Sequence, residues 1–189
     1  QLGFSPHDVR HIILTHLDLD HGGGIADFPQ AKVHLLDAEY RAATQPKSRR
    51  DRYRYRPLQW QHNPDWVRYQ VQGDRWFGFE CIQQLADLPP EILLVPLLGH
   101  THGHTGVAVQ TSTGWLLHAG DAYYYHQEMH PTHPYFPFGL AVVQRIGAID
   151  NSARLHNQAR LRHLKHQQAG TVDIICAHDP VEFEGKEEG

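Results

Sequence analysis

The sequence is poor in cysteine, has no basic excess and contains no long apolar run. Its 189 residues include two cysteines, Cys81 and Cys176, which form no Cys-x-x-Cys pair. This usage predicts reduced thiols in a cytoplasmic protein rather than a disulfide framework. No run of about 18 apolar residues and no signal-peptide pattern is found, so we expect no membrane partner. The formal net charge of −4 offers no attraction for nucleic acid, so we expect no nucleic-acid partner either.

The composition is typical of a globular domain. Hydrophobic residues make up 40% of the chain and charged residues 20%, and 189 residues are enough to enclose a sizeable core. We predict a single α/β domain over residues 1–189, with an irregular, cap-like insert at about 44–66 that is rich in Arg, Tyr, Gln and Pro. The unusual number is 17 histidines, because histidine is the commonest metal ligand in proteins.

Short apolar and β-branched runs predict a set of buried strands. The strands are expected at 9–15, 31–36, 92–98 and 172–177, with two more around a turn at 73–74 (67–71 and 75–82) and a hairpin at 106–110 and 115–118. Apolar spacings of three and four residues predict helices at 37–43 and, as one long helix, at 140–168.

Metal-binding side chains follow the ends of these predicted strands. His16, His100, Asp121 and His178 each come just after a strand, where loops held by a rigid sheet commonly carry functional sites. The densest cluster is His16-Leu17-Asp18-Leu19-Asp20-His21, with four potential ligands in six residues. Imidazole suits zinc, iron and nickel, and carboxylate tolerates several of these metals, so the sequence predicts a metal site.

The order of these motifs resembles the metallo-β-lactamase superfamily. The series HxDxDH, GHTxGHTG, GD and a late strand-end histidine covers about residues 9 to 183, and its style is closest to the N-acyl-homoserine lactonase and glyoxalase II branches. The resemblance implies an αββα sandwich whose N-terminal strands are absent from this sequence, and a small-molecule substrate. It implies a hydroxide between two divalent metal ions that attacks an ester, lactone or thioester carbonyl.

The resemblance also assigns roles to individual residues. The first metal is expected at His16, Asp18 and His100, the second at Asp20, His21 and His178, and Asp121 is expected to bridge the two. Asp20 is further expected to move a proton to the leaving group. In the lactonase branch a tyrosine three residues after the bridging aspartate donates a hydrogen bond to the substrate carbonyl, which would be Tyr124 here.

One departure from the family pattern bears on the metal. The family has histidine where this chain has Asp18, and a carboxylate makes the cluster harder and more anionic. Two zinc ions remain the first expectation, with iron or manganese as alternatives. A flavodiiron-like di-iron redox protein and a non-catalytic metal-binding protein remain alternative functions, and the sequence leaves the substrate and the oligomeric state open.

Overall fold

The computed structural model describes residues 3–184 of the chain. It divides into two compact units, residues 1–70 and residues 71–189. Each unit is built around its own sheet, and each is described by itself below.

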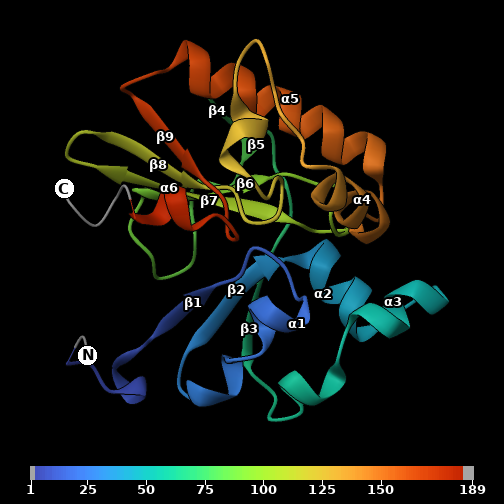
Figure 1. Ribbon diagram of the computed structural model, residues 1–189. Coiled ribbons are helices and arrows are strands. Elements are labelled where there is room, and N and C mark those ends of the chain that lie inside the picture. The colour runs from blue at the N-terminus through green and yellow to red at the C-terminus, as the bar shows by residue number, and fades with distance from the viewer. Residues whose placement is uncertain (1–2, 185–189) are drawn as a thin grey trace. The chain divides into compact units, whose positions relative to one another are not determined.

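The first unit is built on a three-stranded parallel sheet (Figure 1). Its strands are β1 (His11–Ile13), β2 (Lys32–Leu36) and β3 (Asp65–Tyr69), with β2 in the middle. A short helix, η1 (Pro6–Asp8), precedes β1. Parallel strands need crossover connections, and these carry the short helices α1 (Leu19–Gly22), η2 (Ile25–Asp27), α2 (Asp37–Thr44), α3 (Arg49–Arg54) and η3 (Pro57–Trp60). Leu17, Val33 and Leu35 are completely buried in its core.

The segment 44–66, expected to be irregular, contains regular structure. It holds α3, η3 and the start of β3. Helix α3 begins with a capping box, in which the Ser48 hydroxyl accepts from the Asp51 backbone N–H and the Asp51 carboxylate accepts from the Ser48 backbone N–H. Tyr55 and Trp60 from this segment are buried in the core of the unit. Long-range packing therefore orders a segment whose own sequence shows no clear periodicity.

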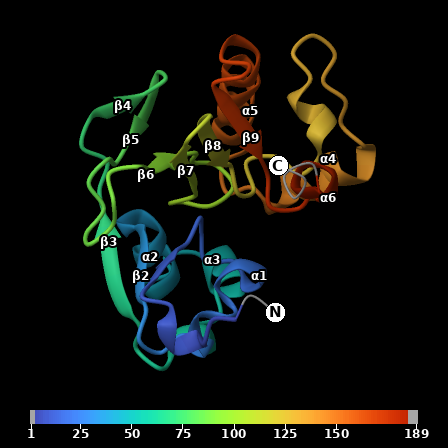
Figure 2. The same cartoon turned by 90° about the vertical axis from the view of Figure 1, so that its left-hand side faces the viewer.

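The second unit contains a β-hairpin and a four-stranded sheet (Figures 1 and 2). The hairpin is β4 (Asp74–Trp76) with β5 (Phe79–Cys81), and the sheet has the order β6 (Ile92–Pro96), β7 (Thr105–Thr111), β8 (Gly114–His118) and β9 (Val172–Ile175). Strand β7 is antiparallel to both β6 and β8, and β9 is parallel to β8. Strands β6, β8 and β9 therefore run in the same direction and end at the same edge of the sheet.

Helices complete the second unit. They are η4 (His126–Met129), α4 (Phe138–Gly147), α5 (Asn151–Gln167) and α6 (Pro180–Glu184). Helix α5 packs against β9 (Figure 1), and Leu161 and Leu164 of α5 lie in the same core as Ile174 of β9. No helix in the described part of the chain is long and apolar enough to cross a membrane.

Two expectations for the second unit are wrong. The single helix at 140–168 is two helices, because the backbone N–H groups of Ile149 and Asp150 bond to the His100 and Gly99 carbonyls instead of continuing the helix. The hairpin turn lies at Phe77–Gly78 and not at 73–74. The strand at 67–71 pairs in the other sheet, as β3.

Candidate metal centre

The first unit brings together the expected ligands of the HxDxDH motif. His16 Nε2 lies 3.4 Å from Asp18 Oδ2, and His21 Nε2 lies 3.6 Å from Asp20 Oδ2. The ring centroids of His16 and His21 lie 4.1 Å apart. Two ligand atoms on one tetrahedral zinc ion, each bonded at about 2.1 Å, are separated by roughly 3.4 Å. The spacing within each pair therefore fits ligands that share a metal ion.

The backbone of this motif explains how the ligands turn toward each other. Strand β1 ends at Ile13, Leu17 is buried in the core, and Asp18 becomes the N-cap residue of α1. The His21 and Gly22 backbone N–H groups then bond to the Asp18 carbonyl. The chain is therefore extended up to Asp18, whereas Asp20 and His21 lie on a helical turn.

Two contacts fix the ligand side chains of this motif. The Thr15 hydroxyl lies 3.0 Å from His16 Nδ1, which leaves Nε2 to point toward Asp18. Arg54 at the end of α3 donates from Nε to Asp18 Oδ1 and from Nη2 to Asp18 Oδ2, both at 2.5 Å. Burial opposes the charged guanidinium, but the hydrogen bond and the charge of Asp18 outweigh it and hold the pKa of Arg54 above its ordinary value.

The second unit places its three expected ligands at one edge of its sheet. His100, Asp121 and His178 follow β6, β8 and β9, the three strands that end at this edge. Asp121 Oδ2 lies 3.4 Å from His100 Nε2, and Asp121 Oδ1 lies 3.2 Å from His178 Nε2. Each carboxylate oxygen thus faces a different histidine. This geometry fits a carboxylate that bridges two metal ions, each also bound by one histidine.

The loop that carries His100 is built around Gly99. Gly99 has φ +130°, and a Cβ atom there would lie 2.3 Å from the Arg154 backbone nitrogen and 2.8 Å from the Asp150 carbonyl oxygen. The Gly99 carbonyl also accepts from the Asp150 N–H at 2.9 Å. Only glycine allows the His100 loop to approach the start of α5 this closely. The break between α4 and α5 therefore positions a ligand loop.

The three histidines of the His100 motif have different surroundings. His104 is buried, and its Nδ1 bonds to the Leu97 carbonyl while its Nε2 accepts from the Asp121 backbone N–H, each at 2.9 Å. Both ring nitrogens of His104 are thus engaged, and it acts as a support for Asp121. His102 is exposed. These contacts leave His100 as the histidine of the motif whose imidazole faces Asp121.

The structure also separates the three consecutive tyrosines. The Tyr124 ring lies 5.2 Å from the His178 ring and 6.2 Å from the His100 ring. Tyr123 is fully buried and donates to Glu182 at 2.6 Å, and the Tyr125 ring packs on His126. Tyr124 is therefore the tyrosine beside the ligand histidines of this unit.

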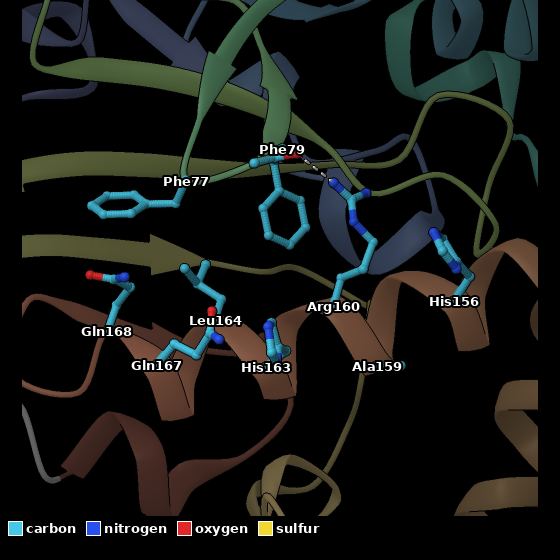
Figure 3. A pocket seen from close by; sticks show the side chains of 10 residues that line it. Phe77, Phe79, His156, Ala159, Arg160, His163, Leu164, Gln167 and Gln168 are labelled. Carbon is cyan, nitrogen blue, oxygen red and sulfur yellow. Dashed lines mark hydrogen bonds between the residues drawn. The ribbon is translucent and has the colours of Figure 1, made fainter.

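Two cavities among the described residues of the second unit differ in whether an expected ligand lines them. A cavity of about 580 Å³ is lined by His178, His118 and Phe183, among others. The other, also about 580 Å³, lies between the β4–β5 hairpin and α5, where Arg160 stacks on Phe79 (Figure 3). It is lined by none of the residues that the sequence assigns to the site.

Sequence analysis missed the residues that support the ligands. Arg54 and Glu39 were not singled out, because they lie 36 and 22 residues from the loop positions that they bond, Asp18 and Leu17. The Ser48–Asp51 capping box was the one local signal that could have predicted α3 and thereby the position of Arg54.

Comparison with known proteins identifies the family. The sequence model of one protein family, the Metallo-beta-lactamase superfamily, matches residues 1–146. The chain belongs to this superfamily. A probable metallo-hydrolase of Mycobacterium bovis, to which it is similar, is 41% identical over 180 residues, which are 95% of this chain and 58% of the relative. An N-acyl homoserine lactonase of Bacillus cereus is 27% identical over 139 residues, covering 73% of this chain and 48% of the relative.

A solved structure of a metallo-β-lactamase-fold enzyme confirms the α/β fold. It is an N-acyl homoserine lactone hydrolase with the product N-hexanoyl-L-homoserine bound at its catalytic metal centre. The TM-score is 0.68 at 20% identity, over 97% of this chain and 61% of that structure. The chain thus spans about three fifths of the length of that lactone hydrolase, and about the same share of the Mycobacterium bovis metallo-hydrolase. The predicted superfamily is confirmed by the family model.

Proposed function

We propose that this chain carries the metal centre of a hydrolase that opens a lactone or cleaves a related ester or thioester. The observation that carries the proposal is the Asp121 carboxylate, whose two oxygens lie 3.4 Å and 3.2 Å from the imidazoles of His100 and His178. Asp121 is buried, and one carboxylate with a histidine on each oxygen fits a ligand shared by two metal ions. Membership of the Metallo-beta-lactamase superfamily supports the same chemistry.

The donor set fits two divalent cations. We propose that one is held by His16, Asp18 and His100, the other by Asp20, His21 and His178, with Asp121 shared. The support is the order of the motifs along the chain and the spacing within each unit, since the paired donor atoms of each unit lie 3.2–3.6 Å apart. Nitrogen and oxygen donors of this kind suit zinc, and the extra carboxylate of Asp18 also admits iron or manganese.

Two divalent cations in such a site supply an activated water nucleophile and a Lewis acid for a carbonyl oxygen. The chain's own residues then orient the substrate and move protons. We propose that the Tyr124 hydroxyl donates a hydrogen bond to the substrate carbonyl, because its ring lies beside the His100 and His178 imidazoles. Asp20, with a side chain that is 62% exposed, is open to solvent and suited to carry a proton to the leaving group.

Similarity to lactonases supports the choice of substrate class. The Bacillus cereus relative is named an N-acyl homoserine lactonase, and the solved lactone hydrolase binds an acyl-homoserine product. We therefore place lactones first and simple esters and thioesters second. The two buried cysteines are free, which accords with a reducing compartment such as the cytoplasm.

A metal analysis paired with a substrate screen tests the proposal. The purified protein is expected to contain close to two zinc, iron or manganese ions per chain and to hydrolyse at least one acyl-homoserine lactone. Tyr124→Phe should lower kcat/KM by about 100- to 1000-fold, in line with the loss of one hydrogen bond to a developing oxyanion. Tyr125→Phe is the matched control and should leave kcat/KM unchanged. Absence of bound metal, or metal without hydrolysis of any lactone, ester or thioester, would refute the proposal.

A further inference from the structure

The segment 49–60 of the first unit holds the loop of the HxDxDH motif at three adjacent positions. Arg54 binds both oxygens of Asp18. The Gln59 side-chain amide donates to the Leu19 carbonyl at 2.9 Å. Tyr55 donates to Glu39, which itself accepts the Leu17 backbone N–H at 3.0 Å. Three residues of one segment thus fix the residue before Asp18, its carboxylate and the residue after it.

The contact between Arg54 and Asp18 has a specific geometry. The guanidinium approaches the carboxylate as a fork, with one N–H on each oxygen, and both side chains are largely buried, at 12% and 18% exposure. A fork of this kind fixes the plane of the carboxylate as well as its position. In the fixed position Oδ2 lies 3.4 Å from His16 Nε2, which is the spacing of two ligands on one metal ion.

The fork leaves Asp18 able to bind a metal. A carboxylate offers about four lone-pair sites, and a bidentate guanidinium uses two of them. The backbone on either side of Asp18 is held separately, by completely buried Glu39 and by Gln59. Burial of the Asp18 charge is compensated by the charge of Arg54. The segment therefore presents a rigid, neutralised carboxylate toward His16.

We propose that Arg54 is a positioning residue for the metal centre, which aims the Asp18 carboxylate at the ion bound by His16. The inference rests on the proposed function, because it assumes that the HxDxDH loop binds metal. It assigns the segment 49–60 the task of holding the loop of the HxDxDH motif. Hydrogen-bonded partners of metal ligands typically change metal affinity by about 10- to 100-fold when they are removed.

The test measures metal affinity rather than turnover. Apo-protein is titrated with Zn²⁺ against a chromophoric chelator, and with Co²⁺ while its visible absorption is recorded. In Arg54→Met one of the two ions should bind about 10- to 100-fold more weakly, with a changed Co²⁺ spectrum, and the other should change less than about threefold. Arg54→Lys keeps the charge without the fork and should fall between. Arg52→Met removes an exposed charge from the same helix and should match the unchanged protein.

A double-substitution cycle separates positioning from general support of the fold. In an Asp18→Asn background, Arg54→Met should cause little further loss of metal affinity, because the carboxylate that Arg54 aims is gone. If Arg54→Met does not fold, Arg54→Lys in the two backgrounds carries the same test. Unchanged or tighter binding in the Arg54 variants, or an equal loss in the Asp18→Asn background, would overturn the inference and leave the proposed function intact. If the unsubstituted protein binds no metal, both fail.

Discussion

Gly99→Ala is expected to destabilise the second unit severely. The backbone at φ +130° is strained for alanine, which costs about 1–3 kcal/mol. The new Cβ would also lie 2.3 Å from the Arg154 backbone nitrogen and 2.7 Å from its Cα atom. These are backbone atoms at the start of a 17-residue helix, so relief requires the loop or the helix to move, at a further cost of about 1–3 kcal/mol. The sum is about 2–6 kcal/mol, a large part of the stability of an ordinary domain.

The matched control is Gly170→Ala. Gly170 also has positive φ, at +82°, but nothing lies within 4 Å of the Cβ position, so this variant isolates the cost of the backbone conformation. Urea denaturation followed by circular dichroism gives the free energy of unfolding of each variant. Metal titration measures whether the His100 loop keeps the position that the proposed metal site requires. Gly99→Ala should be at least about 1 kcal/mol less stable than Gly170→Ala and should bind metal more weakly. Equal stability of the two variants would show that close packing at Gly99 does not hold the loop.

Three further measurements test the metal centre, the thiols and the core. Removal of metal by a chelator should abolish hydrolysis and lower the free energy of unfolding by about 2.7 kcal/mol if the free metal had been at 100 times Kd; an unchanged melting curve would contradict this. Burial raises the pKa of the Cys81 thiol, which lowers its thiolate fraction at any given pH, and Cys176 is also buried. Neither should react rapidly with a thiol reagent before unfolding, and two fast thiols in the native protein would refute the packing. Leu161→Ala, at a completely buried position of α5, should cost about 3 kcal/mol, whereas Leu155→Ala, at a largely exposed position of the same helix, should cost less than about 1 kcal/mol.

The sequence predicted most of the strands and the histidine- and aspartate-bearing loops that follow them, because both are marked locally. Apolar runs mark the strands around Val33 and Ile174, and the ligand residues follow strands that end abruptly. His100, for example, comes just after the run that forms β6. A family pattern spread over most of the chain then linked the motifs. These features depend on near neighbours in sequence, so they could be read without coordinates.

The features that were missed depend on contacts between distant residues. The periodicity over 140–168 favours one helix. Instead, the first helix ends with Ala148 as its C-cap residue, because the backbone N–H groups of Ile149 and Asp150 bond to the carbonyls of His100 and Gly99. The hairpin turn at Phe77 uses φ +45° in a residue that is not glycine, and no turn motif marks it. Arg54 shows no local sign of its role, since its partner Asp18 lies 36 residues earlier.

The parallel pairing of β8 with β9 has a consequence for how this protein is made. Strand β9 reaches β8 only through a long crossover that includes α4 and α5, and loop closure over such a distance is slow compared with hairpin formation. His178 lies just beyond β9, so it can reach Asp121, 3.2 Å away in the folded unit, only after β9 has paired with β8. The proposed metal centre would therefore form late in folding of the second unit, after its slowest strand pairing.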